Sequence, residues 1–425
     1  MLAVVVGVAA AIGSSAVEGK LLGGSGLSFL VVQRDGSVYA TGRNDVGQLG
    51  LNFYSDEQYA PLVVPNLPQQ VVDVCSKGVS SCVITGSGLA SCTGLNTNGQ
   101  LGDGTAFTRP KFSPVLAISQ VKEVFCGDSF TCAVTEQGAG KCWGDASTGV
   151  LGIGNVTNVR QTTPVPVVGF ETAGLASIST GQSHACFLHL QGRVYCTGLN
   201  TYGQLGLGNA MSKLVPTLVS FDITFASVAC GGDHTCAATA QGAVWCWGQN
   251  WWGQLGDGTL TSSLVPVLAL KTGAQSVWLG HTNSFVLMLD GTARGFGDLS
   301  NEARDPELTP VVLATGKGEI REIRGGYLAV CVLLDQAVCC MGDNSFGQLG
   351  LGNKTAYSSV FAAMPGLPSF PANPPTAKPQ VLPTKKTTLS PSPKRTKAPV
   401  VKTTKQPTPK PTKKQPTKKP TRKAG

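Results

Sequence analysis

Residues 248–259 read GQNWWGQLGDGT, and six other stretches of the chain repeat this phrase. The other copies are GRNDVGQLGLN from Gly42, GLNTNGQLGDGT from Gly94, GDASTGVLGIGN from Gly144, GLNTYGQLGLGN from Gly198, the degraded GDLSNEARD from Gly297, and GDNSFGQLGLGN from Gly342. Successive copies begin 52, 50, 54, 50, 49 and 45 residues apart. A period near fifty residues is typical of propeller blades and similar repeat arrays.

Each repeat also contains the same order of short strands. In the fifth repeat, strands are expected at 226–230, 234–239, 243–248 and 265–270. The glycines of QLGxG suit a tight loop, with Leu packed on the core and Gln bonded to the backbone. No run of ten residues shows sustained helical periodicity. The sequence therefore predicts an all-β fold, a seven-bladed β-propeller.

The repeats resemble one known family. The phrase VYxxGxNxxGQLGxG, preceded by variants of Gly-x-x-His-Thr such as CGGDHTC at 230–236 and TGQSHAC at 180–186, resembles the RCC1 family of propellers over residues 21–368. This resemblance implies a binding propeller, since RCC1-like proteins include exported inhibitors, extracellular regions of plant receptors and a guanine-nucleotide exchange factor. The repeated Gly-Trp-Arg-His-Thr phrase of RCC1-like plant ultraviolet receptors is missing, so photoreception is not expected.

Ten of the fourteen cysteines form regularly spaced couples: Cys82 and Cys92, Cys132 and Cys142, Cys186 and Cys196, Cys236 and Cys246, and, nine apart, Cys331 and Cys340. Each couple flanks a short hairpin turn, and counting outward from the turn places its members opposite each other, about 4.5–5.5 Å apart between Cα atoms. Leu30 with Ala40 and Phe285 with Gly295 replace the couple in two repeats. The two cysteines of a couple are thus either both present or both replaced in a repeat. This pattern favours five disulfides over the alternatives, in which the cysteines are small buried apolar residues or zinc ligands.

The other four cysteines have no assigned state. Cys75, Cys126 and Cys230 are expected at matching places near the axis, before the Gly-x-x-His segment, and Cys339 stands next to a coupled cysteine.

Several features indicate export. Five disulfides are typical of an oxidising compartment. Residues 1–16 suit a signal peptide, although they lack a basic residue, and a leading strand is the alternative. Glycosylation sequons begin at Asn155 and Asn353, at the same position of two repeats. Either these asparagines are glycosylated or they only close a turn. We expect a secreted, cell-wall or matrix protein, with a nuclear location as the alternative.

The charge of +9 hides two different parts. Residues 371–425 contain fifteen of the 33 Lys and Arg and no acidic residue, which leaves 18 basic against 24 acidic residues before them. A disordered Lys/Pro/Thr-rich tail is expected there, following a propeller over 17–370. Such a tail would associate with a polyanion, either an acidic polysaccharide or nucleic acid, or serve as a spacer.

The sequence contains no recurring catalytic constellation, Walker-type loop or metal-ligand run, so we expect no enzyme activity, no cofactor and no metal. His184 and His234 share one repeat position, where capping a turn of their own blade is the structural interpretation. The candidate partner face comprises Asp128, His184, Asp233, His234 and His281.

Two functions lead at this stage, and a stalk-borne structural protein that lacks a saturable partner is the third possibility. The first is a monomeric scaffold that recognises a protein or glycan on one face, without a membrane span. The alternative, implied by the resemblance, is guanine-nucleotide exchange on a small GTPase with a chromatin-binding tail. The fold alone does not choose between them.

Overall fold

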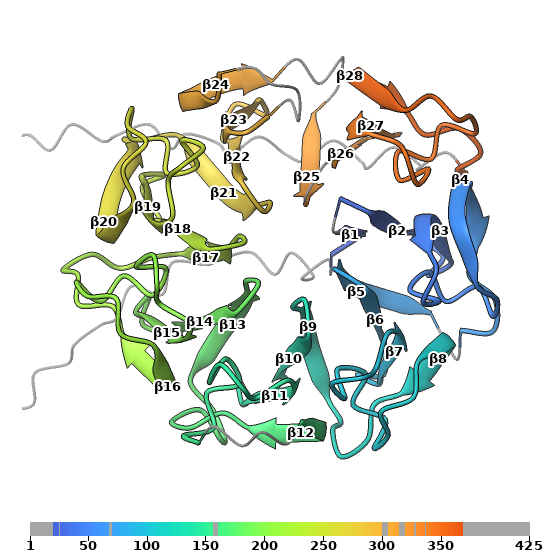
Figure 1. Cartoon of the computed structure of the whole chain (residues 1–425), viewed down its shortest axis with the longest axis horizontal. Helices are drawn as coiled ribbons and strands as arrows, with labels where there is room; N and C mark the ends of the chain where they lie inside the picture. The colour runs from blue at the N-terminus through green and yellow to red at the C-terminus, as the bar shows by residue number, and fades with distance from the viewer. Residues whose placement is uncertain are drawn as a thin grey trace, which may run out of the picture. The chain divides into compact units, whose positions relative to one another are not determined.

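The computed structural model describes residues 20–24, 26–67, 70–155, 160–299, 305–313, 319–326, 329–335 and 337–368. These residues form seven four-stranded antiparallel sheets arranged as a ring around a common axis (Figure 1). The predicted seven-bladed propeller is therefore confirmed. No helix in the described ranges is long and apolar enough to cross a membrane. The signal-peptide and tail predictions lie outside the described residues.

The strands of each blade follow one another in the sequence. Blade 1 has β1 (Leu22–Gly24), β2 (Ser28–Val32), β3 (Val38–Asn44) and β4 (Ser55–Val63); blade 2 has β5 (Val71–Lys77), β6 (Ser80–Thr85), β7 (Ala90–Gly94) and β8 (Arg109–Pro114); blade 3 has β9 (Val121–Cys126), β10 (Phe130–Thr135), β11 (Gly140–Gly144) and β12 (Gln161–Pro166); blade 4 has β13 (Leu175–Thr180), β14 (His184–His189), β15 (Val194–Gly198) and β16 (Lys213–Leu218). Blade 5 has β17 (Ser227–Cys230), β18 (His234–Ala238), β19 (Val244–Gly248) and β20 (Ser263–Leu270); blade 6 has β21 (Ala274–Leu279), β22 (Asn283–Met288), β23 (Ala293–Gly297) and β24 (Glu307–Leu313); blade 7 has β25 (Ile320–Gly325), β26 (Ala329–Leu334), β27 (Val338–Asp343) and β28 (Tyr357–Ala363).

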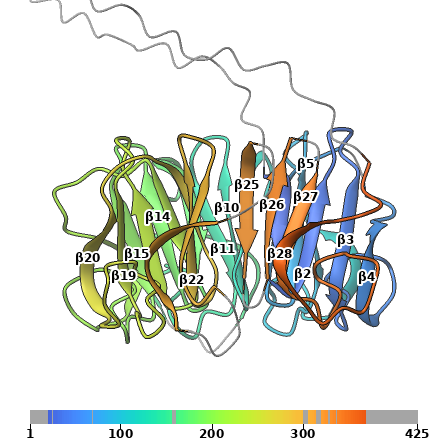
Figure 2. The same ribbon diagram turned by 90° about the horizontal axis from the view of Figure 1, so that it is seen from above.

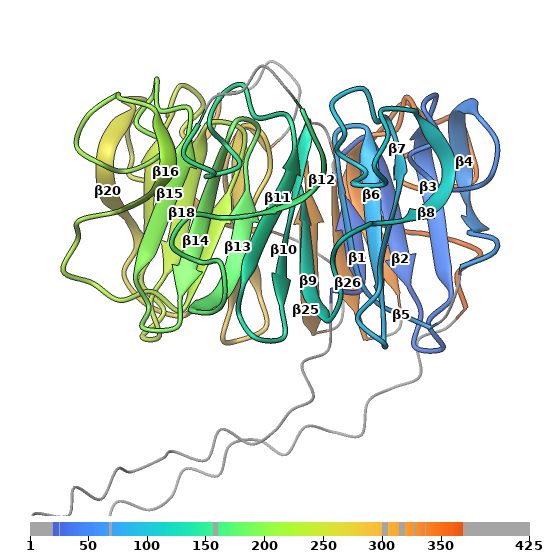
Figure 3. The ribbon, with the colours of Figure 1, turned by 90° about the horizontal axis from the view of Figure 1, so that it is seen from below.

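The first strand of each blade lies nearest the axis and the fourth lies at the rim (Figure 1). Seen edge-on, the strands run across the thickness of the propeller (Figures 2 and 3). The four strands expected in the fifth repeat are β17–β20, with ends that differ from the prediction by at most two residues.

The hydrophobic core is divided into seven layers, one between each pair of neighbouring blades. The second strand of a blade is covered on both faces, and β6, β10 and β22 are accordingly buried along their whole length. Such strands carry apolar residues in nearly continuous runs instead of alternating with polar ones. Blade-to-blade packing, more than any single sheet, therefore stabilises the fold.

The QLGxG loops are held as the sequence predicts. In blade 5, the Gln254 side chain accepts a hydrogen bond from the Trp252 amide at 2.9 Å, and Leu255 is fully buried. The Leu255 amide in turn donates to Asn250 Oδ1 at 2.9 Å. Gly248 precedes this loop with a φ of 103°, and a Cβ there would lie 2.6 Å from the Asp233 carbonyl oxygen. Only glycine fits that turn without strain.

The cysteine couples lie in register, as counting from the turns predicts. Cys82 is paired with Cys92 across β6 and β7, and the structure has a disulfide at each of the five predicted couples. The Cα–Cα distances are 4.0–4.1 Å, slightly shorter than expected for opposed residues. Leu30 faces Ala40, and Phe285 faces Gly295, at the equivalent positions of blades 1 and 6.

The ring closes without a shared strand. All four strands of blade 1 come from the beginning of the described chain, and all four of blade 7 come from its end. Contacts between complete blades must therefore hold the seam. One side of it packs Leu22 and Phe29 against Cys331 and Leu349, and the Thr41 hydroxyl donates to the Gly347 carbonyl at 2.8 Å.

Candidate functional site

Two sets of loops share one face of the propeller. Because neighbouring strands are antiparallel, the loops that join first to second strands and third to fourth strands emerge on the same side. In blade 2 the two loops are hydrogen bonded, since the Leu95 amide donates to the Val79 carbonyl at 2.9 Å. We call this side the long-loop face. It carries all five predicted partner-face positions in or beside its inner loops, and it also carries the QLGxG loops.

His184 and His234 are fully buried, so they cannot contact a partner, and this part of the expected face is corrected. His184 Nε2 lies 2.9 Å from Thr235 Oγ1, and His234 Nε2 lies 2.9 Å from Ser284 Oγ. Thr235 and Ser284 each donate their hydroxyl proton to a carbonyl, so each imidazole Nε2 must be the donor. The rings thus join neighbouring blades and do not cap turns within their own.

The glycine three residues before each histidine makes room for the ring. A Cβ at Gly181 would lie 2.3 Å from the His184 ring, and a Cβ at Gly231 would lie 2.3 Å from the His234 ring. Burial lowers the pKa of both imidazoles to about 3, so both are neutral at physiological pH. The Gly-x-x-His motif is therefore a packing motif between blades.

A cavity of about 370 Å³ occupies the axis. All seven innermost strands contribute to its lining, and the apolar side chains among them include Phe125, Ile178, Val228, Trp278 and Leu279. Cavities of this size and mainly apolar character are typical of small-molecule sites.

Lys77 lies at the end of this cavity nearer the long-loop face. Its Nζ reaches from blade 2 to blade 4 and donates to the Thr180 carbonyl at 2.6 Å. Burial lowers the pKa of this ammonium. Sequence reasoning missed Lys77, although a signal existed: Gly127, Gly181, Gly231, Gly280 and Gly326 stand at this position in five other blades. Lysine fits in blade 2 because the residue three positions later is the small Ser80.

Asp128, Asp233 and His281 lie beside Lys77, and each is partly exposed. Asp233 accepts a hydrogen bond from Gln204 Nε2 at 3.0 Å. Burial raises the pKa of Asp128 and of Asp233 and lowers that of His281. These three residues of the expected partner face are thus brought together around the axis.

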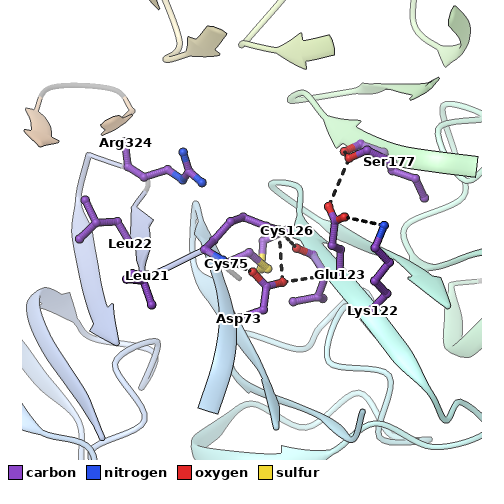
Figure 4. A network of polar contacts seen from close by, with 12 residues as sticks. Leu21, Leu22, Asp73, Cys75, Lys122, Glu123, Cys126, Ser177 and Arg324 are labelled. Atoms are coloured by element: carbon purple, nitrogen blue, oxygen red, sulfur yellow. Dashed lines mark hydrogen bonds and ion pairs between the residues drawn. A yellow bond between two sulfur atoms is a disulfide. The ribbon is translucent and has the colours of Figure 1, made fainter. Parts of the chain in front are cut away.

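Toward the opposite end of the cavity, the charged residues that the structure describes are paired, and Figure 4 shows the contact between Lys122 and Glu123. Lys20 Nζ lies 3.3 Å from Asp73 Oδ2, and Lys122 Nζ lies 3.5 Å from Glu123 Oε1. Arg324 forms an ion pair with Glu322, whose other oxygen accepts the Leu21 and Leu22 amides. Burial raises the pKa of Asp73 and of Glu322.

A sixth disulfide joins Cys75 to Cys126, between the innermost strands of blades 2 and 3 (Figure 4). In the strand register, Cys75 lies opposite Cys82 of the next strand. Cys126 lies opposite Thr131, which corresponds to Ser81 of blade 2. Cys75 therefore lies one residue earlier than the expected match. Since side chains alternate along a strand, the two sulfurs point toward each other across the interface. Cys230 and Cys339 are free and buried.

Two clusters of potential metal ligands exist in the described part of the chain, Cys75 with Cys82 and Cys126, and His184 with Cys186 and Cys230. All three sulfurs of the first and one of the second belong to disulfides. The remaining His184 and Cys230 offer too few ligands for a tetrahedral site.

Large aromatic side chains are exposed on the long-loop face. Trp251 is 57% exposed and Trp252 is 45% exposed, in the loop between β19 and β20. Tyr202 of the neighbouring blade meets Trp251 edge-on, with 5.0 Å between ring centroids. Asn155 and Asn353 are also exposed, although residues 156 and 157 of the first sequon lie outside the described residues.

Comparison with known families agrees with this geometry. The model of the RCC1-like domain matches residues 37–303, which is more than half of the chain. The chain belongs to the RCC1-like domain family. Among curated relatives, it is 33% identical over 153 residues to the ultraviolet-B receptor UVR8 of Arabidopsis thaliana, covering 35% of this chain and 34% of the receptor. It is 30% identical over 173 residues to the mouse regulator of chromosome condensation, covering 40% and 41%.

The matches cover well under half of the length of these relatives. A third, the rat protein described as probable E3 ubiquitin-protein ligase HERC4, is 31% identical over 194 residues, which is 45% of this chain and 18% of that protein. Among solved structures, human WBSCR16 superimposes with a TM-score of 0.71 at 22% identity, covering 79% of this chain and 95% of that one. Yeast RCC1 (Prp20), solved bound to Kap60, gives 0.69 at 18% identity, covering 84% and 90%. These likenesses show the shared fold.

Proposed function

We propose that this RCC1-like propeller is an exported, non-enzymatic binding module that recognises a protein or glycan through its long-loop face. The observation that carries the proposal is the aromatic cluster of Tyr202, Trp251 and Trp252. Exposed Trp side chains keep large apolar areas in contact with water, and such clusters commonly mark binding surfaces. Asp128, Asp233 and His281 supply polar groups on the same face.

Six disulfides support export, because disulfide-rich proteins are typical of oxidising compartments. In this proposal residues 1–16 are a signal peptide, Asn155 and Asn353 are glycosylated, and the protein is a monomer. The fifteen basic residues of 371–425 associate with an acidic polysaccharide of the wall or matrix.

Intact mass of the natively expressed protein tests export. Without reduction we expect two thiols to react with an alkylating agent after denaturation, because Cys230 and Cys339 are the free cysteines. After reduction all fourteen should react, and the first sixteen residues should be absent. Fourteen reactive thiols before reduction, on an uncleaved chain, would contradict export.

Paired substitutions test the binding face. Trp251→Ala with Trp252→Ala removes the aromatic cluster, whereas Leu190→Ala with Leu289→Ala removes side chains 70% and 71% exposed on the opposite face. We expect the tryptophan variant to give at least tenfold weaker signals in proximity labelling and glycan-array binding. The leucine variant should keep the wild-type signals. Protease or glycosidase treatment then separates protein from glycan partners. Equal binding by both variants would exclude this face.

Guanine-nucleotide exchange is the second candidate, favoured by the similarity to the regulator of chromosome condensation. The yeast relative Prp20p, whose structure is solved, binds Gsp1p and histones. In this alternative the protein is nuclear and its tail binds chromatin. Release of fluorescent GDP from Gsp1p tests it directly, and acceleration by the propeller would replace the export proposal.

A further inference from the structure

The axial cavity has two charged side chains that lack full pairing. Lys77 has three N–H donors, and its one hydrogen bond among the described residues goes to the Thr180 carbonyl. Asp128 belongs to blade 3, between the blades of these two residues, and within the described ranges it has no hydrogen bond and no ion pair within 4 Å. It interacts electrostatically with the Lys77 ammonium. Partly buried charges normally acquire such partners.

The other charged residues lining the cavity are already neutralised. Lys20 is paired with Asp73, Glu123 with Lys122, and Arg324 with Glu322. Among the described residues that line the cavity, an incoming ligand would therefore meet incompletely paired charges at the Lys77 and Asp128 end.

These two side chains have opposite charges, and both line the cavity. A simple anion would satisfy Lys77 but be repelled by Asp128 and Asp233, and a simple cation would leave Lys77 unpaired. A molecule that carries a carboxylate and an ammonium close together satisfies both at once. Beyond them, Val228, Trp278 and Leu279 form an apolar wall that suits an apolar side chain.

We propose that the axial cavity binds a free α-amino acid with an apolar side chain, with its carboxylate on Lys77, its ammonium on Asp128 and its side chain against Trp278. The site is separate from the aromatic cluster, and the inference does not depend on the proposed partner binding. Lysine in place of the glycine found in five other blades is the sequence change that creates it.

Changes to the ligand test the proposal without altering the protein. Calorimetry on the full chain with intact disulfides would compare L-phenylalanine with L-phenylalaninamide, which lacks the carboxylate, and with N-acetyl-L-phenylalanine, which lacks the ammonium. We expect L-phenylalanine to bind and each derivative to bind at least tenfold more weakly. No saturable binding of L-phenylalanine or L-leucine, or equal binding of all three phenylalanine compounds, would overturn the proposal.

Two substitutions locate the binding groups. Lys77→Met should abolish the preference for phenylalanine over its amide, and Asp128→Asn should abolish the preference over the N-acetyl compound. Lys141→Met and Asp290→Asn, at positions outside the cavity lining, are the matched controls and should retain both preferences. Thermal unfolding checks that each variant is folded. Preferences unchanged in both cavity variants would place the amino acid elsewhere and contradict the assignment.

Discussion

The buried histidines show how a single repeated residue can serve structure where function was expected. His184 and His234 lie at the same position of blades 4 and 5, and each donates to a hydroxyl of the next blade. That hydroxyl donates its own hydrogen bond to a carbonyl of the QLGxG loop in the preceding blade. One imidazole thus connects the axis-proximal loop, the neighbouring second strand and the outer loop. All groups in this series of hydrogen bonds are neutral, which suits a buried interface.

The depressed pKa of His234 makes stability depend on pH. The folded pKa is about 3, whereas an unperturbed imidazole titrates near pH 6.5. Between these values the unfolded chain binds a proton that the folded protein does not. The free energy of unfolding is therefore complete above about pH 6.5 and falls as the pH is lowered through this window.

His234→Asn isolates this effect, because blade 6 has Asn283 at the same position. Between pH 4 and 6, we expect the slope of the unfolding free energy against pH to decrease by about 1.4 kcal/mol per pH unit. Urea denaturation with intact disulfides measures the slope. Gln191→Asn, at an exposed turn position, is the control and should retain the wild-type slope. An unchanged slope in His234→Asn would contradict a neutral buried imidazole.

Among the elements, the innermost strands carry the largest differences between blades. Ser179 of β13 occupies the position of Cys75 in β5, and Cys230 of β17 occupies that of Cys126 in β9. The Cys230 amide donates to Ser179 Oγ at 2.9 Å, so the two residues already meet across blades 4 and 5. The geometry that supports one interblade disulfide thus recurs two blades further on.

Ser179→Cys should therefore form a second interblade disulfide. The number of reactive thiols in the denatured, unreduced protein should fall from two to one, leaving Cys339. Mass spectrometry after alkylation counts them, and peptide mapping identifies the new bond. Ser212→Cys, in an exposed loop, is the control and should raise the count to three. A count of three in Ser179→Cys would show that the blades are not equivalent here.

Sequence reasoning succeeded where partners lie on one hairpin and failed where they lie on different blades. Counting from a turn placed Cys82 opposite Cys92, because antiparallel pairing links residue number directly to position. No such count reaches from Cys75 to Cys126, or from His234 to Ser284, since both contacts depend on how neighbouring sheets pack. Lys77 differs, because alignment of the repeats would have revealed it among glycines.

At the scale of the whole molecule, the seam between blades 1 and 7 decides whether the ring stays closed. No strand crosses it, and β1 has three residues. Glu322 of blade 7 holds this short strand by accepting the Leu21 and Leu22 amides at 2.9 and 3.1 Å. On the outer side, Lys354 Nζ lies 3.2 Å from Glu57 Oε1, in contact with solvent. One seam thus offers a buried carboxylate and an exposed one for comparison.

Glu322→Ala should open the seam. It leaves the Leu21 and Leu22 amides and the Arg324 guanidinium without their carboxylate partner, which should lower the free energy of unfolding by about 3–5 kcal/mol. We expect hydrogen exchange to accelerate first in β1 and β25, while blades 3 to 5 remain protected, because stability is local in repeat folds. Glu57→Ala removes an ion pair exposed to water at the same seam and should leave exchange nearly unchanged. If Glu322→Ala accelerated exchange equally in all seven blades, the ring would unfold as one unit, and the seam would not be its point of opening.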